Sequence, residues 1–224
     1  MKKIIFSIIS ILLLCVLTLI VNYIFFQKNV SRISMGKPIV QKDTKSQALL
    51  VIDVQESLTG SLSADNYYIR QSGELIKNIN EIADSSAKNN IPVIYIKSEI
   101  SNSLINILNS SLAKGSPGAT FDSRLKIVSD LIISKSKNDA FSNSLLDSVL
   151  IRNDINKLIF TGLDLSQCVN STIQAAINRK YEICLISDAV LATSDSLHEV
   201  RLNEFKERGF EILSTKEYLN IMIQ

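Results

Sequence analysis

Hydrophobic residues follow two kinds of pattern along this chain. Short, almost continuous apolar runs alternate with longer stretches in which apolar residues recur every three or four positions. Residues 48–53 are apolar up to the final acid, which is typical of a central strand in a parallel sheet. Residues 67–89 follow with helical spacing, and residues 91–96 are again a continuous run. The alternation predicts an α/β fold with a mainly parallel sheet.

The second half of the chain continues this alternation. Residues 98–121 form a long irregular stretch with the sequence Gly115-Ser116-Pro117-Gly118, and loops of such length in a compact domain are often functional. The pattern predicts one three-layer domain of about six strands over residues 47–224. The further strands are expected at 131–133, 157–161, 182–187 and 210–213, and the further helices at 142–151, 169–179, 195–208 and after Thr215.

The first 26 residues differ from the rest. Residues 4–26 are 23 positions without a charge, preceded by Lys2 and Lys3, which is long enough to cross a membrane as a helix. Because no small-residue cleavage site stands near its end, we expect an uncleaved single-span anchor at residues 1–26. Residues 27–46 are polar and rich in Lys and Ser, which predicts a tether. Basic residues on both sides leave the orientation open.

Composition narrows the classes of function. The net charge is +2, with acids and bases interspersed, and no basic cluster indicates a nucleic-acid surface. The three cysteines, Cys15, Cys168 and Cys184, show no CxxC spacing, so a disulfide framework is not expected.

Cys168 has the most informative surroundings. It follows the predicted strand at 157–161 and a short turn, and it begins the predicted helix. Unpaired N–H groups at a helix N-terminus favour thiolate over thiol, so the position predicts a reactive cysteine. The alternative is a buried cysteine that fills a gap in the core.

Two charged residues stand at the ends of other predicted strands. Asp53 ends the first strand and Lys135 follows the strand at 131–133. Since parallel strands end at one edge of a sheet, both are expected near Cys168. A carboxylate can accept the thiol proton, and a lysine can stabilise both anions. Lys137, two residues further on, is the rival for the lysine role.

Four sequence blocks, in this order and spacing, resemble the isochorismatase-like cysteine hydrolase superfamily, which includes nicotinamidases and N-carbamoyl amidohydrolases. The resemblance runs from about Ala48 to the C-terminus. The blocks are Leu50-Val51-Ile52-Asp53-Val54-Gln55, Lys135 to Phe141, Thr161-Gly162 through Cys168-Val169 and Thr172, and Ser187-Asp188-Ala189 with His198-Glu199 and Gly209-Phe210 behind it.

The resemblance implies roles for particular residues. It makes Asp53, Lys135 and Cys168 a catalytic triad. It also implies a cis peptide bond between Leu163 and Asp164, which would orient the N–H groups of Asp164 and Cys168 as an oxyanion hole. Gln55, Phe141 and Leu163 are candidates for the substrate pocket, with core or loop-bracing roles as the alternative for Gln55 and Phe141.

One departure from the family bears on metal binding. Nicotinamidases of this family hold a metal through an aspartate and two histidines, whereas this chain has a single histidine, His198. A zinc site of that type, or any other cofactor, is therefore not expected. The family also implies self-association into homo-oligomers.

The sequence thus predicts a membrane-anchored cysteine hydrolase that cleaves an amide or carbamoyl C–N bond of a small molecule through a thioester on Cys168. The alternative is a catalytically inactive, membrane-held binding or assembly domain of the same fold. A redox role for Cys168 would require Cys184 to approach it, which its predicted strand position opposes.

Overall fold

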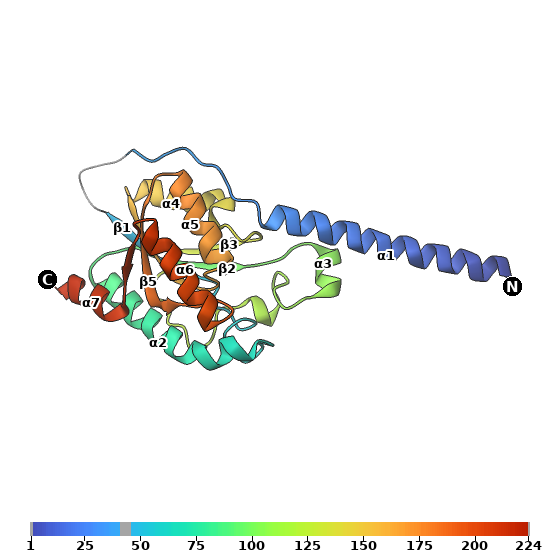
Figure 1. Cartoon of the computed structure of the whole chain (residues 1–224), viewed down its shortest axis with the longest axis horizontal. Coiled ribbons are helices and arrows are strands. Elements are labelled where there is room, and N and C mark those ends of the chain that lie inside the picture. The colour runs from blue at the N-terminus through green and yellow to red at the C-terminus, as the bar shows by residue number, and fades with distance from the viewer. Residues whose placement is uncertain (1, 41–45, 224) are drawn as a thin grey trace.

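The computed structural model describes residues 2–40 and 46–223, so residues 41–45 of the expected tether lie outside the described residues. A long N-terminal helix projects from an α/β body (Figure 1). The strands are β1 Gln47–Ile52, β2 Val93–Ser98, β3 Ile132–Lys135, β4 Lys157–Gly162, β5 Glu182–Val190 and β6 Glu211–Leu213. The α-helices are α1 Lys2–Val30, α2 Asn66–Lys88, α3 Ser103–Leu108, α4 Ser144–Arg152, α5 Cys168–Asn178, α6 Asp195–Glu207 and α7 Thr215–Ile223.

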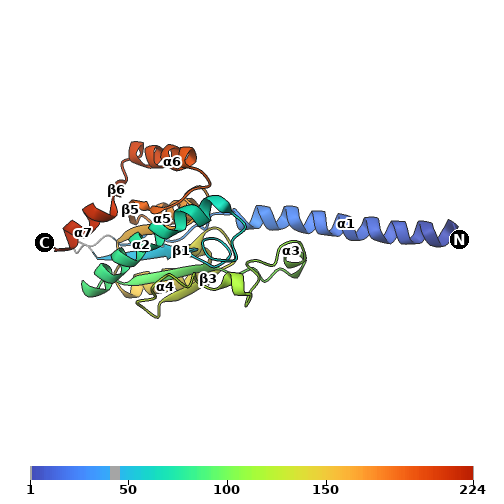
Figure 2. The same ribbon diagram turned by 90° about the horizontal axis from the view of Figure 1, so that it is seen from below.

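All strand pairs are parallel, in the order β3-β2-β1-β4-β5-β6. Helices cover both faces of the sheet (Figure 2). Alternate residues of β1 separate the two cores: Leu49 packs on the side of α2 and α7, and Leu50 on the side of α4, α5 and α6. The single three-layer domain predicted from the sequence is therefore confirmed.

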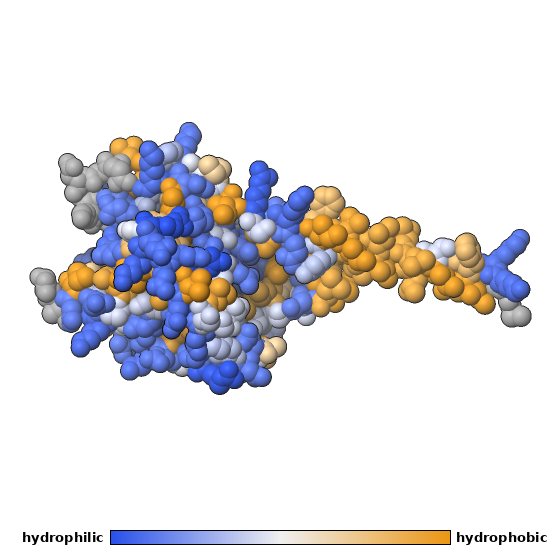
Figure 3. Space-filling model, viewed as in Figure 1, coloured by the Kyte–Doolittle hydropathy of each residue, from blue (hydrophilic) through white to orange (hydrophobic). Residues whose placement is uncertain are grey.

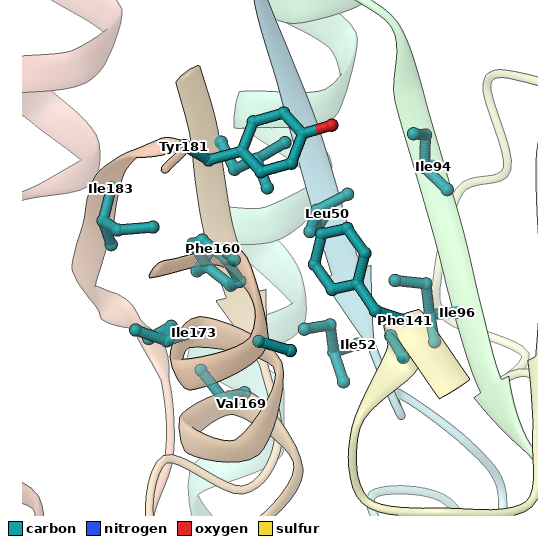
Figure 4. Close-up of a cluster of buried hydrophobic side chains, with 14 of the residues drawn as sticks. Leu50, Ile52, Ile94, Ile96, Phe141, Phe160, Val169, Ile173, Tyr181 and Ile183 are labelled. Atoms are coloured by element: carbon teal, nitrogen blue, oxygen red, sulfur yellow. The ribbon is translucent and has the colours of Figure 1, made fainter. Parts of the chain in front are cut away.

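The core on the α4–α6 side supports the end of the sheet that carries Cys168. Leu50 of β1 and Phe160 of β4 meet Val169 and Ile173 of α5 in this cluster (Figure 4). These side chains are fully buried. Burial of each contributes about 1.5–3 kcal/mol, which fixes α5 and its first residue against the sheet.

The strand order reverses between β1 and β4, where open parallel sheets form their binding crevices. Gly162 ends β4 with φ 105°, and a Cβ at this position would overlap the backbone of Ile52 at the end of β1. Only glycine allows both this conformation and this close approach. The two strand ends that lead to Asp53 and Cys168 are thereby held side by side.

The N-terminal helix α1 continues four residues past the expected end of the apolar segment, to Val30. It is long and apolar enough to cross a membrane, and its apolar surface is almost wholly exposed in the isolated chain (Figure 3). A signal sequence can share these properties.

The described part of the expected tether lies along the body instead of standing free of it. Ile33 and Ile39 pack against the core on the α4–α6 side. The Ser34 amide donates to the buried Asp139 carboxylate at 2.7 Å, and the Ile39 amide donates to the Arg179 carbonyl at 2.8 Å. These contacts fix the position from which α1 leaves the domain.

Candidate active site

The three residues predicted to act together meet at the carboxyl edge of the sheet. The Lys135 Nζ donates to Asp53 Oδ2 at 2.7 Å and lies 3.3 Å from Cys168 Sγ. Lys135 is the last residue of β3, Asp53 follows β1, and Cys168 is the first residue of α5. Asp53 adopts a left-handed backbone conformation, φ 54°, which turns the chain at the end of the strand.

Ser98 completes this polar cluster, and the sequence reasoning missed it. Its hydroxyl donates to Asp53 Oδ1 at 3.0 Å and accepts from Lys135 Nζ at 2.8 Å. Ser98 ends β2, the strand between β1 and β3, so the strand order could have pointed to it. Gln55 braces this strand end, because its side chain accepts from the Ser98 amide and donates to the Ser98 carbonyl.

The thiol of Cys168 is not the low-pKa group that its helix-start position predicts. Burial raises its pKa to about 12; the charge of Lys135 opposes this rise, and the charge of Asp53 adds to it. Desolvation of the charged form is the largest cause of this rise, and it acts against the thiolate that a helix N-terminus favours. At neutral pH the resting group is therefore a thiol, which needs a base to become a nucleophile.

Lys135 behaves as a buried ammonium. Burial alone would lower its pKa, but the interactions of the ammonium with Asp53 and Cys168 outweigh burial and raise it. Its side chain is fully buried, and the Asp53 side chain is 3% exposed. Lys137, the other candidate for the lysine role, lies on the wall of the cavity that opens beside Cys168. Geometry therefore favours Lys135 over Lys137 as the lysine partner of the thiol.

Alkylation of Cys168 by iodoacetamide should keep rising with pH well above the free-cysteine value of about 8.5, because only the thiolate reacts. Asp53→Asn removes a charge that raises the pKa of Cys168, so it should speed labelling of Cys168 at a given pH. Lys135→Met removes a charge that lowers the pKa and should slow it. Peptide mass spectrometry of the full chain carrying Cys15→Ser measures the rate. A plateau reached below neutral pH would contradict this picture.

The peptide bond between Leu163 and Asp164 is cis, as the resemblance predicts. Within the described residues, the amides of Asp164 and Cys168 have no hydrogen-bond acceptor in the chain. The Asp164 carboxylate accepts from Tyr68 at 2.6 Å and from the Ser166 amide at 2.5 Å. Tyr68 of α2, which the sequence analysis did not single out, thus fixes the loop before Cys168.

A cavity of about 420 Å³ opens beside Cys168. Of the three predicted pocket residues, Leu163 lines it, whereas Gln55 and Phe141 do not. Phe141 belongs to the core and lies under the Arg179 guanidinium, 4.3 Å from its ring centre. Its side chain is too deep in that core to reach the cavity. The wall includes Asp53, Ser98, Asn138, Leu163, Asp164 and Cys168 around the nucleophile, the apolar or aromatic residues Leu58, Tyr68, Ile100 and Leu112, and Phe26, Gln27 and Val30 from α1.

Two other singled-out residues lie outside this site. His198 of α6 contacts the Ser187 carbonyl through Nε2 at 3.0 Å, which is a structural contact. Cys184 is buried in β5, within the core on the α2 side. Among residues 2–40 and 46–223, no group of three or more His, Cys, Asp or Glu side chains is placed to hold a metal ion.

The parallel α/β sheet brings a thiol, a carboxylate and an ammonium together at one edge, which is the arrangement that the resemblance implies for a cysteine hydrolase. The isochorismatase domain model matches residues 47–217. The chain therefore belongs to the isochorismatase family and is a hydrolase of that family.

Known relatives are similar to this chain in sequence, and solved structures are similar to it in fold. The ureidoacrylate amidohydrolase RutB of Pseudomonas savastanoi pv. phaseolicola is 28% identical over 169 residues, 63% of this chain and 69% of that protein. A cysteine hydrolase from Pseudomonas syringae pv. phaseolicola has the same fold, with a TM-score of 0.72 and 21% identity over 84% of this chain and 98% of that one. N-carbamoylsarcosine amidase from Thermoplasma acidophilum superposes with a TM-score of 0.65 and 22% identity, covering 77% and 98%.

Proposed function

We propose that this protein hydrolyses the C–N bond of a non-peptide amide or carbamoyl compound through a thioester on Cys168. The observation that carries the proposal is the contact of Lys135 Nζ with both Asp53 and Cys168. One protein similar to this chain is named a ureidoacrylate amidohydrolase, and a structural neighbour is named an N-carbamoylsarcosine amidase. Their names support the reaction class and leave the substrate of this chain open.

In the first half of the reaction, Cys168 Sγ attacks the carbonyl carbon and Asp53 accepts the thiol proton. A base is required because burial keeps Cys168 protonated at neutral pH. The C–N bond then breaks, and Asp53 returns the proton to the leaving nitrogen, which departs as ammonia or an amine. The Lys135 ammonium stays close to both anionic groups throughout.

In the second half, water attacks the thioester carbonyl and Asp53 accepts a proton from it. The C–S bond breaks, the proton returns to sulfur, and the carboxylic or carbamic acid leaves. The amides of Asp164 and Cys168 are our candidates for the oxyanion hole, because neither has an acceptor within the described chain.

We also propose that α1 stays attached and anchors the domain to a membrane. Its apolar length supports this, and so does the contact of its last residue with the body, where the Val30 carbonyl accepts from the Asn138 amide. The membrane holds the domain at its surface.

One experiment tests both proposals. Cells that produce the full chain are separated into membrane and soluble fractions, and the protein from each is mixed with a panel of short amides and N-carbamoyl compounds, quenched in acid and weighed both intact and as peptides. We expect a mass that includes α1 and, with a substrate, an added acyl or carbamoyl group on the Cys168 peptide. A soluble protein that lacks residues 2–30 would overturn the anchor. The absence of any adduct or turnover across the panel would favour the inactive binding domain.

A further inference from the structure

The last turn of α1 forms part of the wall of the catalytic cavity. Phe26, Gln27 and Val30 line the same cavity as Cys168. The carbonyl of Val30 accepts from the Asn138 amide at 3.0 Å, and Asn138 lies 3.9 Å from Cys168 Sγ. The helix end is thus held beside the nucleophile by a backbone contact.

Residues 31–40, which follow α1, also contact the body and fix where the end of α1 lies. Arg179 donates to the Ser34 hydroxyl at 3.2 Å and forms a two-point ion pair with Asp147 of α4 at 2.7 and 2.9 Å. A Cβ at Gly36 would overlap the Arg179 guanidinium, so the chain passes close to this side chain and a larger residue would displace it. The end of α1 is therefore part of the folded domain.

The cavity has both polar and apolar lining. Asp53, Ser98 and Cys168 line it together with the polar residues Gln27, Asn109, Lys137 and Gln167, and its apolar lining includes Phe26, Leu58, Ile100 and Leu112. The apolar side chains can contact hydrocarbon, while Asp53 and Cys168 provide the groups that react with an amide.

Helix α3 lies beside the cavity end of α1 in both views (Figures 1 and 2). It carries two exposed apolar side chains, Ile107 at 71% and Leu108 at 55% exposure. It belongs to the loop that the sequence analysis singled out at residues 98–121. The apolar surface of α1 thus continues onto α3 next to the cavity.

The length of the apolar segment places this region at a membrane surface. The 23 uncharged residues 4–26 span about 34 Å at about 1.5 Å per residue, close to the roughly 30 Å of a hydrocarbon core. Phe26 is the last of them and Lys28 follows, so the cavity wall begins where the hydrocarbon ends. A molecule in the adjacent leaflet would meet the cavity without crossing open water.

We propose that the substrate is an amphiphilic amide taken from the membrane surface, with its hydrocarbon chain against Phe26 and Val30 and its amide carbonyl at Cys168. This proposal rests on the cysteine-hydrolase function and on α1 as a membrane anchor. It makes the end of α1 a specificity-determining element.

The test uses the full chain carrying Cys15→Ser in phospholipid nanodiscs. Iodoacetamide and N-dodecyl iodoacetamide are the probes; in each, Cys168 sulfur displaces iodide and the thiol proton is released. We expect the dodecyl probe to label the Cys168 peptide faster, and Phe26→Ser to lower the dodecyl-to-unsubstituted rate ratio about tenfold, the loss expected for one aromatic apolar contact. Phe25→Ser is the matched control, because Phe25 is 69% exposed and does not line the cavity; it should leave the ratio unchanged.

Three outcomes distinguish a failure of the amphiphile site from a failure of the hydrolytic function. A ratio that Phe26→Ser leaves unchanged, or lowers no more than Phe25→Ser, overturns the amphiphile site even if short amides are hydrolysed. A ratio that falls only with Phe26→Ser supports the site even if no amide in the panel is turned over, and in that case the hydrolytic function is what fails. A dodecyl probe that labels wild type more slowly than iodoacetamide also overturns the site.

Discussion

Replacing Cys168 with alanine is expected to lower amide turnover by roughly four orders of magnitude or more, since loss of a covalent nucleophile leaves only binding and oxyanion stabilisation. The fold should persist, because Cys168 lies at the helix start beside an open cavity and its removal leaves no buried charge unpaired. Release of ammonia or amine from a substrate found in the panel measures the loss. The acyl adduct should disappear with it.

Cys184→Ala is the matched control for this substitution. Cys184 is buried in β5, away from the catalytic cavity, so its loss should cost about 1 kcal/mol of stability and leave turnover near wild type. Full turnover in Cys168→Ala would show that the nucleophile lies elsewhere. Equal losses in the two variants would indicate a folding defect.

Lys135→Met is expected to cost about 3–5 kcal/mol of unfolding free energy, because it leaves the buried Asp53 carboxylate without its ion-pair partner. Both side chains are almost fully excluded from solvent, and Ser98 would be the main remaining hydrogen-bond donor to that carboxylate. Denaturant unfolding of the full chain in detergent, followed by circular dichroism, gives the difference. Turnover should fall as well.

Two further variants test whether the loss of stability in Lys135→Met comes from the buried ion pair. The double variant Asp53→Asn with Lys135→Met removes both charges and should lose less stability than the two single variants added together. Lys137→Met, on the cavity wall, should stay within about 0.5 kcal/mol of wild type, as surface substitutions usually do. Equal effects of Lys135→Met and Lys137→Met would contradict the assignment of Lys135 to the buried pair.

The order of the elements and most of the catalytic cluster were predictable from local pattern. Continuous apolar runs such as 48–52 are stable only when both faces are covered, which specifies a central parallel strand. Their carboxyl ends share one edge, so Asp53, Lys135 and Cys168 could be placed together before any coordinates. The expected helices of the domain differed from the observed bounds by one or two residues, as for Asn66–Lys88 against 67–89, whereas α1 runs four residues further and α3 was not expected.

Other features of the site depend on long-range packing. Ser98 has no signal of its own, and its place between Asp53 and Lys135 follows from the order β3-β2-β1. Phe141 has the spacing of a family pocket residue, but packing beneath Arg179 assigns it to the core.

The sequence by itself determined the α/β class, the apolar N-terminal helix and the meeting of Asp53, Lys135 and Cys168 at one sheet edge, because periodicity and strand polarity are local properties that burial converts directly into structure. Only the tertiary structure decided the charge state of Cys168 and the place of α1 in the cavity wall. The first depends on how far neighbouring elements exclude water from the sulfur, and the second on contacts such as Val30 with Asn138, more than a hundred residues apart. Neither quantity is present in any short stretch of the chain.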